Sequence, residues 1–341
     1  MRSLKMRLRC WLSVITVCLV LLQIVLSAET LPPQLSDAEY WKMINDFSEP
    51  AGYYQYNVVT SNELTYQHSL PDLMKTPRAG GAYLGVGPEQ NFTYIAAVQP
   101  KIAFIFDIRR EMMLEHLMYK CVFEMSANRV EFVANLFSRR APPQLTGDSP
   151  VATIFEAFAR VPADPALAAK NANLIVDRLK TRHHFALTAE DERGIRTLFR
   201  TFAGEGVELF NSSFLSPGYA TLMTLTDGRG KNWAYLATKE NYDRVRLMQQ
   251  QNRIVPLVGD FAGPKAIRAV GQYLKDHGAT VHVFYISNVE DYIQARAKYV
   301  GNIASLPIDA SSVLLRWNIG GATQLDPIAA FLRSQRSVNF R

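Results

Sequence analysis

The amino-acid sequence predicts an α/β protein whose sheet is mostly parallel, with helices on both faces and a helical insertion. First, the run at 102–106 is apolar without polar alternation, as in strands that are covered on both faces. Second, two strand, Gly-Pro, helix, strand units begin near residues 82 and 254, which indicates right-handed crossovers in one sheet. Third, a chain of 341 residues, 48% of them hydrophobic, can bury a sizeable core. Together these observations favour a Rossmann-like architecture.

Residues 1–28 predict a secretory signal peptide or a membrane anchor. Basic residues precede an apolar run from Trp11 to Leu26, and Ser27-Ala28 follow it. Neither cleavage position near Ala28 has the usual pair of small residues, so cleavage and anchoring both stay open. We expect the rest of the chain to be exported to the periplasm or the extracellular space, or to be anchored at the inner membrane, with no other membrane contact.

Net charge and cysteine content exclude further classes. The formal charge is +6, from 37 Lys and Arg against 31 Asp and Glu, but four of the cations lie before the first acid and removing them leaves 33 against 31. A nearly neutral body gives no electrostatic reason for binding nucleic acid, so no such partner is expected. Cys121 is the only cysteine after the leader, which excludes an intrachain disulfide in the processed chain and favours a packing role.

The first half of the sequence predicts the following helices and strands. Residues 29–80 form an N-terminal helix and an irregular lead-in, the helix beginning with a capping box of Ser36 and Glu39. The Rossmann-like domain spans residues 81–320. It opens with a strand at 82–85, a helix that begins at Gly87-Pro88, a strand at 102–106 and a helix at about 110–125.

A helical insertion is expected at about 141–210, with helices near 150–159, 165–181 and 189–202. His183 and His184 fall in a loop there and have no third ligand at metal spacing, so we interpret them as a solvated pair. The alternating pattern then returns, with strands at 233–237, 254–258, 281–286 and 313–319 and helices at 239–251 and 264–278. Pro256 counts against the strand at 254–258, because proline cannot donate to a ladder and prefers edges. Residues 321–341 are expected to form a C-terminal tail.

Polar loops marked by glycines follow the apolar strands, and in a parallel sheet such loops meet at one edge, where ligands bind. Asp107 follows Gly85 by 22 residues, close to the spacing at which a carboxylate on the second strand accepts hydrogen bonds from a ribose. We therefore expect a pocket for a small-molecule ligand. Its predicted cofactor-binding residues are Gly85, Gly87, Glu89, Asn91, Asp107, Asp260 and Phe261.

The first loop disfavours a dinucleotide. Gln90 stands where a dinucleotide fingerprint has its third small residue, and Pro88 lacks an amide donor. Glu89 adds a negative charge where a pyrophosphate would lie. Like charges about 4 Å apart cost about 4 kcal/mol at an effective dielectric constant of 20, more than the roughly 0.3–1 kcal/mol that a helix terminus offers an anion. A ligand with a ribose and a positive centre but no phosphate remains compatible.

These loops resemble those of class I S-adenosylmethionine-dependent methyltransferases, whose first strand ends in a glycine loop and whose second ends in an acid that holds the ribose. The resemblance maps these roles to Gly85, Gly87 and Asp107, makes Asp260-Phe261 the adenine side, and implies S-adenosylmethionine as the cofactor. Tyr83 and Leu84 stand where this family usually has an acid. Over most of residues 34–320 the loops also resemble a family of exported bacterial proteins of unassigned function.

Two functions stay open. In the first, the chain is a transferase in which Asn288 or Glu290 orients or deprotonates an acceptor. In the second, it is a non-catalytic exported or membrane-tethered binding module. Each polar residue then has a structural role, such as a helix cap for Asp107 or an Asx turn for Asp260. The sequence lacks phosphate-loop, serine-elbow and zinc motifs, so no metal is predicted.

Overall fold

The structure is a computed structural model that describes residues 31–56, 58–76, 80–210, 217–318 and 321–338. In this part of the chain, six strands form one sheet in the order β3-β2-β1-β4-β5-β6. The strands are β1 (Ala82–Val86), β2 (Ile102–Asp107), β3 (Ile254–Val258), β4 (Val281–Ser287), β5 (Val313–Trp317) and β6 (Thr323–Pro327). Strands β1 to β5 pair in parallel, and β6 pairs antiparallel with β5. The predicted α/β class with a mostly parallel sheet is confirmed.

The strand order reverses beside β1. Leu84 of β1 lies opposite Phe104 of β2 on one side and Phe284 of β4 on the other. The connection after β1 leads to β2 on one side and the connection after β4 leads to β5 on the other, so the loops after β1 and β4 separate to form a crevice at the carboxyl edge. All residues of β2 and β3 are buried, which explains why their sequences show no polar alternation.

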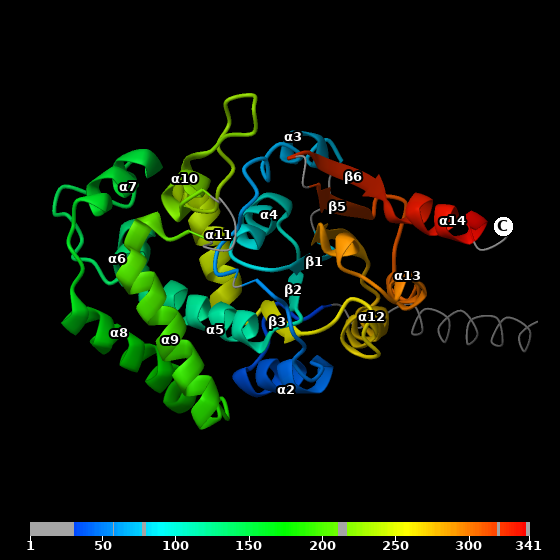
Figure 1. The fold of residues 1–341 in the computed structure, drawn as a ribbon, viewed down its shortest axis with the longest axis horizontal. Helices are drawn as coiled ribbons and strands as arrows, with labels where there is room; N and C mark the ends of the chain where they lie inside the picture. The colour runs from blue at the N-terminus through cyan, green and yellow to red at the C-terminus, as the bar shows by residue number, and fades with distance from the viewer. Residues whose placement is uncertain (1–30, 57, 77–79, 211–216, 319–320, 339–341) are drawn as a thin grey trace, which may run out of the picture.

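Helices cover both faces of the sheet, as predicted (Figure 1). One face carries α4 (Gln90–Val98), α5 (Arg110–Met125) and α11 (Lys239–Gln250), and the other carries α12 (Ala266–Asp276) and α13 (Arg296–Ala304). Helix α5 is buried from Met112 to Phe123 because it lies between the sheet and further helices. The remaining helices of the core region are α2 (Asp37–Phe47), α3 (Leu70–Leu73), α6 (Arg129–Phe137) and α10 (Tyr219–Thr224).

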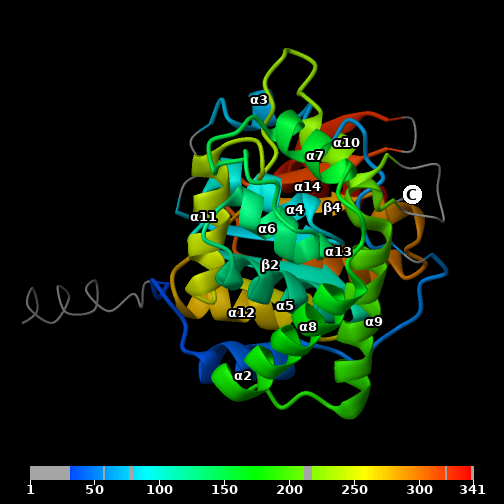
Figure 2. The same ribbon diagram turned by 90° about the vertical axis from the view of Figure 1, so that its left-hand side faces the viewer.

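The segment predicted as an insertion is helical. It contains α7 (Val151–Ala159), α8 (Pro165–Asp177), a π turn (Arg178–Arg182) and α9 (Ala189–Glu205). Helices α8 and α9 pack together on the outer side of α5 and lie in front of the sheet in Figure 2. The interpretation of His183 as solvated is wrong. Its ring is buried and lies between two carboxylates, with Nε2 2.8 Å from Glu124 and Nδ1 3.0 Å from Asp37.

Two further sequence predictions need correction. Residues 233–237 form no strand and end in a turn at 235–237, because side chains satisfy the backbone amides: Gln67 accepts from Trp233 N at 2.6 Å and Thr93 from Tyr235 N at 3.2 Å. The expected tail at 321–341 holds β6 and α14 (Ile328–Val338). By contrast, the strand at 254–258 forms although Pro256 counted against it, because β3 lies at the edge of the sheet, where proline is tolerated.

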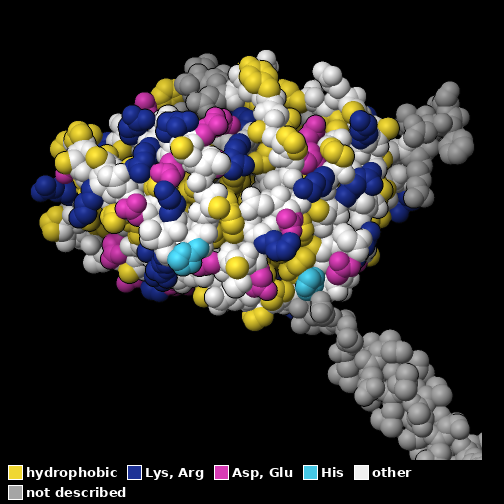
Figure 3. Space-filling view, turned by 90° about the horizontal axis from the view of Figure 1, so that it is seen from below, with side chains coloured by type: hydrophobic (Ala, Val, Ile, Leu, Met, Phe, Trp, Pro, Cys, Tyr) yellow, Lys and Arg dark blue, Asp and Glu magenta, His cyan; other side chains and the backbone are white. Residues whose placement is uncertain are grey.

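The predicted leader at 1–28 lies outside the described residues. Among the residues that are described, no helix is long and apolar enough to cross a membrane. On the face of the molecule seen in Figure 3, Lys and Arg side chains lie interspersed with Asp and Glu.

Candidate functional site

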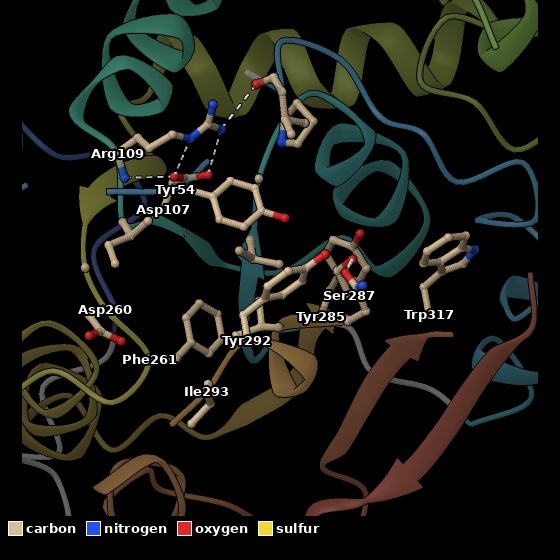
Figure 4. A pocket seen from close by; sticks show the side chains of 18 of the residues that line it. Tyr54, Asp107, Arg109, Asp260, Phe261, Tyr285, Ser287, Tyr292, Ile293 and Trp317 are labelled. Atoms are coloured by element: carbon tan, nitrogen blue, oxygen red, sulfur yellow. Dashed lines mark hydrogen bonds and ion pairs between the residues drawn. The ribbon is translucent and has the colours of Figure 1, made fainter. Parts of the chain in front are cut away.

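A cavity of about 540 Å³ lies at the carboxyl edge of the sheet. The ends of all five parallel strands contribute to its wall, among them Gly87 after β1, Asp107 of β2, Asp260 after β3, Ser287 of β4 and Trp317 of β5. Figure 4 shows Asp107 at one end of this cavity and Tyr285 and Ser287 toward the other, with aromatic rings between them. The carboxyl ends of the strands therefore share one site, as the sequence predicts.

The N-terminal lead-in forms the opposite wall of the cavity. We call residues 48–56 and 58–63 the strap, because they cross the carboxyl ends of β3, β2, β1 and β4 in turn. Glu49 N donates to Val258 O at 2.8 Å, and Gly52 N donates to Ile108 O at 2.8 Å. A Cβ on Gly52 would lie 2.5 Å from the Ile108 side chain, so this close approach needs glycine. The strap ends at Glu63, on the cavity wall.

Asp107 and Arg109 form a buried ion pair at one end of the cavity. Oδ1 of Asp107 accepts hydrogen bonds from Arg109 N at 2.8 Å and Nε at 3.1 Å, and Oδ2 accepts from Nη2 at 3.2 Å. Arg109 also donates to Val58 O of the strap at 3.2 Å and lies over the Tyr54 ring. Although burial lowers the pKa of Arg109, the neighbouring carboxylates, Asp107 first among them, raise this pKa above its ordinary value.

Of the predicted binding residues Gly85, Gly87 and Asn91 in the glycine loop, one lines the cavity and two lie behind it. Gly87 lines the cavity and has φ +77°, a conformation that favours glycine. Gly85 does not line it, and a Cβ there would lie 1.9 Å from Asn91 Oδ1. Asn91 is fully buried, and its amide donates to Val86 O at 2.9 Å and Pro88 O at 2.7 Å. Gly85 and Asn91 therefore shape the loop, and neither lines the cavity as predicted.

Glu89 does not face the cavity, contrary to prediction. It is fully buried, and Oε1 accepts hydrogen bonds from Thr60 Oγ1 at 2.6 Å and Ser61 N at 3.4 Å. Burial raises the pKa of Glu89 to about 7, and the hydrogen bonds only partly offset this rise. Glu89 therefore does not place a negative charge against a phosphate bound in the cavity, as the sequence had suggested.

Asp260 and Phe261 both line the cavity after β3. Oδ1 of Asp260 accepts from Ala262 N at 2.8 Å, the Asx turn that was one of the two interpretations of this residue. Phe261 is buried and stacks on Phe284, with ring centroids 5.4 Å apart. Its ring forms part of the cavity wall and does not fill the cavity. Adenine binding by these two residues stays a prediction.

A buried carboxyl group from the strap, Glu63, closes the other end of the cavity. Oε1 of Glu63 accepts from Tyr285 OH at 2.6 Å and from Ser287 Oγ, and Oε2 accepts from Gln90 Nε2 at 2.9 Å. Gln90 Nε2 also donates to Tyr285 OH at 2.6 Å. Burial raises the pKa of Glu63 although all three donors oppose the rise. The site thus contains a buried carboxyl group whose surroundings disfavour its charged form, a feature common at functional sites.

Ser287, the last residue of β4, holds a strained backbone conformation with φ +50°. The pairing of β4 with β5 is irregular between Tyr285 and Ser287, and this irregularity turns Ser287 toward Glu63. Non-glycine residues in this region of φ persist where surrounding contacts impose them, and they occur frequently at functional sites. The strain therefore supports a ligand-related role for this end of the cavity.

The two predicted acceptor residues differ in position. Asn288 lines the cavity, and its amide donates to Asp291 Oδ2 at 3.2 Å. Glu290 does not line it. Its carboxylate pairs with Arg316 Nε at 2.5 Å and Arg296 Nη2 at 3.5 Å, so the predicted role of Glu290 as a base is not supported by its position. The role of Asn288 stays a prediction.

Sequence reasoning missed Glu63, Arg109 and Tyr285. Arg109 pairs with Asp107 two residues earlier, and no motif in the sequence indicates this pair. Glu63 lies in the lead-in, where no periodic pattern exists to place it. The dense hydroxyl content of residues 53–66 was the one signal in the sequence that this segment covers a polar site.

The arrangement offers two polar ends and an aromatic middle. Tyr54, Phe261 and Tyr292 lie between the Asp107 end and the Glu63 end in Figure 4. Among the described residues, no group of three His, Cys, Asp or Glu side chains could hold a metal ion. A flat organic ligand with hydrogen-bonding groups at both ends fits this cavity.

Comparison with known proteins gives a family without a function. A profile described as a domain of unknown function (DUF7790) matches residues 58–145 and 173–327, which together contain all six strands and Glu63. A search of curated proteins finds no match. Because the matched segments span more than half of the sequence, the chain belongs to the DUF7790 family, a domain of unknown function.

Proposed function

We propose that this protein binds a nucleoside-type small molecule at the carboxyl edge of its sheet and transfers a group from it, as class I S-adenosylmethionine-dependent methyltransferases do. The observation that carries this proposal is the position of Asp107. It ends the second strand, lines the cavity and lies beside the point where strand order reverses. This is where a carboxylate accepts hydrogen bonds from ribose hydroxyls in nucleoside-binding sheets of this type.

Asp107 retains capacity for such a bond. A carboxylate offers about four acceptor positions. Arg109 occupies two of them on Oδ1 and one on Oδ2, so Oδ2 has one free for a ribose hydroxyl. Ile108, Phe261 and Ala262 line the adjacent wall and supply an apolar surface for a base.

The charges that line the cavity favour a ligand without phosphate. Arg109 is the one Lys, Arg or His side chain among the described lining residues, and Asp107 already neutralises it. Glu63 and Asp260 add acidic groups. A bound phosphate would lack a cationic partner here, and NAD and FAD are therefore poor candidates.

Isothermal titration of the purified full-length chain with S-adenosylmethionine and S-adenosylhomocysteine tests this proposal. We expect binding by the native protein and loss of most of the affinity in Asp107→Asn, because the carboxylate is the ribose acceptor. Asp191→Asn is the matched control, since Asp191 pairs with Arg110 at 2.6 Å but does not line the cavity. No heat from either ligand at millimolar concentration would refute the proposal.

A binding module without chemistry is the second candidate. It is favoured by the engagement of Glu290 in two ion pairs, which removes the predicted base. Native mass spectrometry of the purified chain separates the two functions. A co-purified ligand that stays unchanged on incubation supports the module, and conversion of S-adenosylmethionine to S-adenosylhomocysteine supports the transferase.

A further inference from the structure

The carboxyl group of Glu63 has no cationic partner in the described structure. Its three hydrogen-bond donors, Tyr285, Ser287 and Gln90, are all neutral. The other charged groups on the cavity wall are the Asp107–Arg109 pair, which is internally neutral, and Asp260 at the opposite end from Ser287 in Figure 4. The Glu63 end is therefore acidic and unbalanced, and a positive charge placed there would be stabilised.

Aromatic rings line the cavity near the Glu63 end. Tyr54, Tyr285, Tyr292 and Trp317 line the cavity, and Tyr54 and Tyr292 meet edge to face with ring centroids 5.3 Å apart. The faces of aromatic rings attract cations, and clusters of such rings bind ammonium groups that carry several methyl substituents. The cavity thus combines two features that favour a cation, a carboxyl group and an aromatic wall.

We propose that the Glu63 end binds a positively charged ammonium or sulfonium group, so that the ligand of this protein is a cationic nucleoside. The nucleoside half of this statement rests on the proposed function, whereas the cationic half rests on Glu63 and the aromatic wall. The hydroxyl hydrogens of Tyr285 and Ser287 are used toward Glu63. The oxygen of Ser287 is left to accept a hydrogen bond from the ligand, which suits an ammonium donor.

Binding is coupled to ionisation of Glu63. Burial raises the pKa of this carboxyl group, and a cation placed against it favours the charged form. The groups that face it are Tyr285 and Ser287 from β4 and Gln90 from α4, with Tyr83 of β1 and Tyr94 of α4 also within electrostatic range. None of these carries a positive charge, so a cationic ligand lowers the pKa of Glu63, whereas a neutral one does not.

The test compares matched probes on the full-length chain by isothermal titration. Adenosine is neutral, 5′-amino-5′-deoxyadenosine carries an ammonium group at neutral pH, and S-adenosylmethionine carries a sulfonium group. Benzyltrimethylammonium supplies the positive charge without a nucleoside. We expect the native protein to bind the amino nucleoside at least about tenfold more tightly than adenosine, which is about 1.4 kcal/mol.

Glu63→Gln is expected to abolish this preference while leaving the affinity for adenosine unchanged. Glu89→Gln is the matched control, because Glu89 is equally buried but does not line the cavity, and it keeps the preference. Thermal unfolding confirms that each variant is folded. If Glu63→Gln does not fold, Tyr285→Phe provides a second and milder change at the same end. We expect it to weaken the preference for the amino nucleoside.

Each outcome separates the two proposals. Equal binding of adenosine and the amino nucleoside by the native protein overturns the cation site and leaves nucleoside binding in place, as does a preference that survives Glu63→Gln. Failure of all nucleosides, together with benzyltrimethylammonium binding that depends on Glu63, removes the proposed function and keeps the cation site. Absence of binding by every probe overturns both.

Discussion

The raised pKa of Glu89 makes a quantitative prediction about stability. Glu89 is fully buried behind the glycine loop, and its Oε2 atom has no hydrogen-bond partner. Its pKa rises from 4.5 to about 7, which corresponds to about 3 kcal/mol at 1.36 kcal/mol per unit. Between these two pH values the unfolded chain releases the proton while the folded chain keeps it. The contribution of Glu89 to the free energy of unfolding is therefore largest below pH 4.5 and is lost as the pH rises through 7.

Glu89→Gln replaces the protonated carboxyl with a neutral group of the same shape and retains the oxygen that accepts from Thr60. We expect the variant and the native protein to be about equally stable at pH 4, and the variant to be more stable by about 3 kcal/mol at pH 8. Denaturant unfolding followed by tryptophan fluorescence at pH 4 to 8 measures this difference. The native curve also includes Glu63 and Glu115, whose pKa values burial raises, so only the difference between the two proteins is compared.

Glu111→Gln is the control, because it makes the same exchange at an exposed position of α5. We expect its free energy of unfolding to stay within about 0.5 kcal/mol of that of the native protein, as is usual for substitutions at exposed positions. If Glu89→Gln and the native protein had parallel curves from pH 4 to 8, Glu89 would be ionised in the folded state, and the conclusion that it is neutral behind the loop would be wrong.

Three further predictions follow from the same structure. Although burial opposes it, hydrogen bonds and charges from three basic neighbours, His183 first among them, lower the pKa of Glu124 to about 2. The stability that Glu124 contributes is thus present above pH 4.5 and lost as the pH falls through 2. Glu124→Gln is expected to lower the free energy of unfolding by about 3 kcal/mol at neutral pH in denaturant unfolding. An unchanged free energy of unfolding would contradict this prediction. Gly87→Ala costs about 1–2 kcal/mol from its left-handed backbone alone, since nothing lies within 4 Å of the added carbon, and unchanged thermal stability would disprove that strain. Glu290→Gln weakens its pair with Arg316 and lowers stability by about 1–3 kcal/mol without changing ligand affinity; weaker ligand binding measured by calorimetry would restore Glu290 to the site.

Local signals in the sequence located most elements of the sheet. The apolar run of β2, the capping box of Ser36 and Glu39, and the apolar stripe of α5 each depend on neighbours within a few residues, and each matches the structure. Pro256 counted against its strand, and only the position of β3 at the sheet edge explains why proline is tolerated there. The strand prediction at 233–237 was wrong because backbone amides there donate to side chains from distant segments, Gln67 and Thr93. No local pattern contains these contacts.

The glycine loop shows where side-chain direction escapes prediction. Successive residues on a helix differ in direction by about 100°, so the rotation of α4 decides which side chains at its start face the ligand. Every residue of α4 is buried, and it therefore has no polar face that would reveal this rotation. The structure turns Glu89 and Asn91 inward and places Gln90 on the cavity wall, against Glu63.

By itself, the sequence determined the α/β class, the shared edge of the strand ends and the place of Asp107 on that edge, because hydrophobic periodicity and parallel pairing depend on local pattern. Only the tertiary structure decided that Arg109 neutralises Asp107 and that Glu63 supplies the acidic end of the cavity. The strap reaches this cavity through contacts between residues more than 200 positions apart, such as Glu63 with Tyr285. Such contacts form when the whole chain buries its apolar surface, so they leave no periodic trace in the segment that makes them.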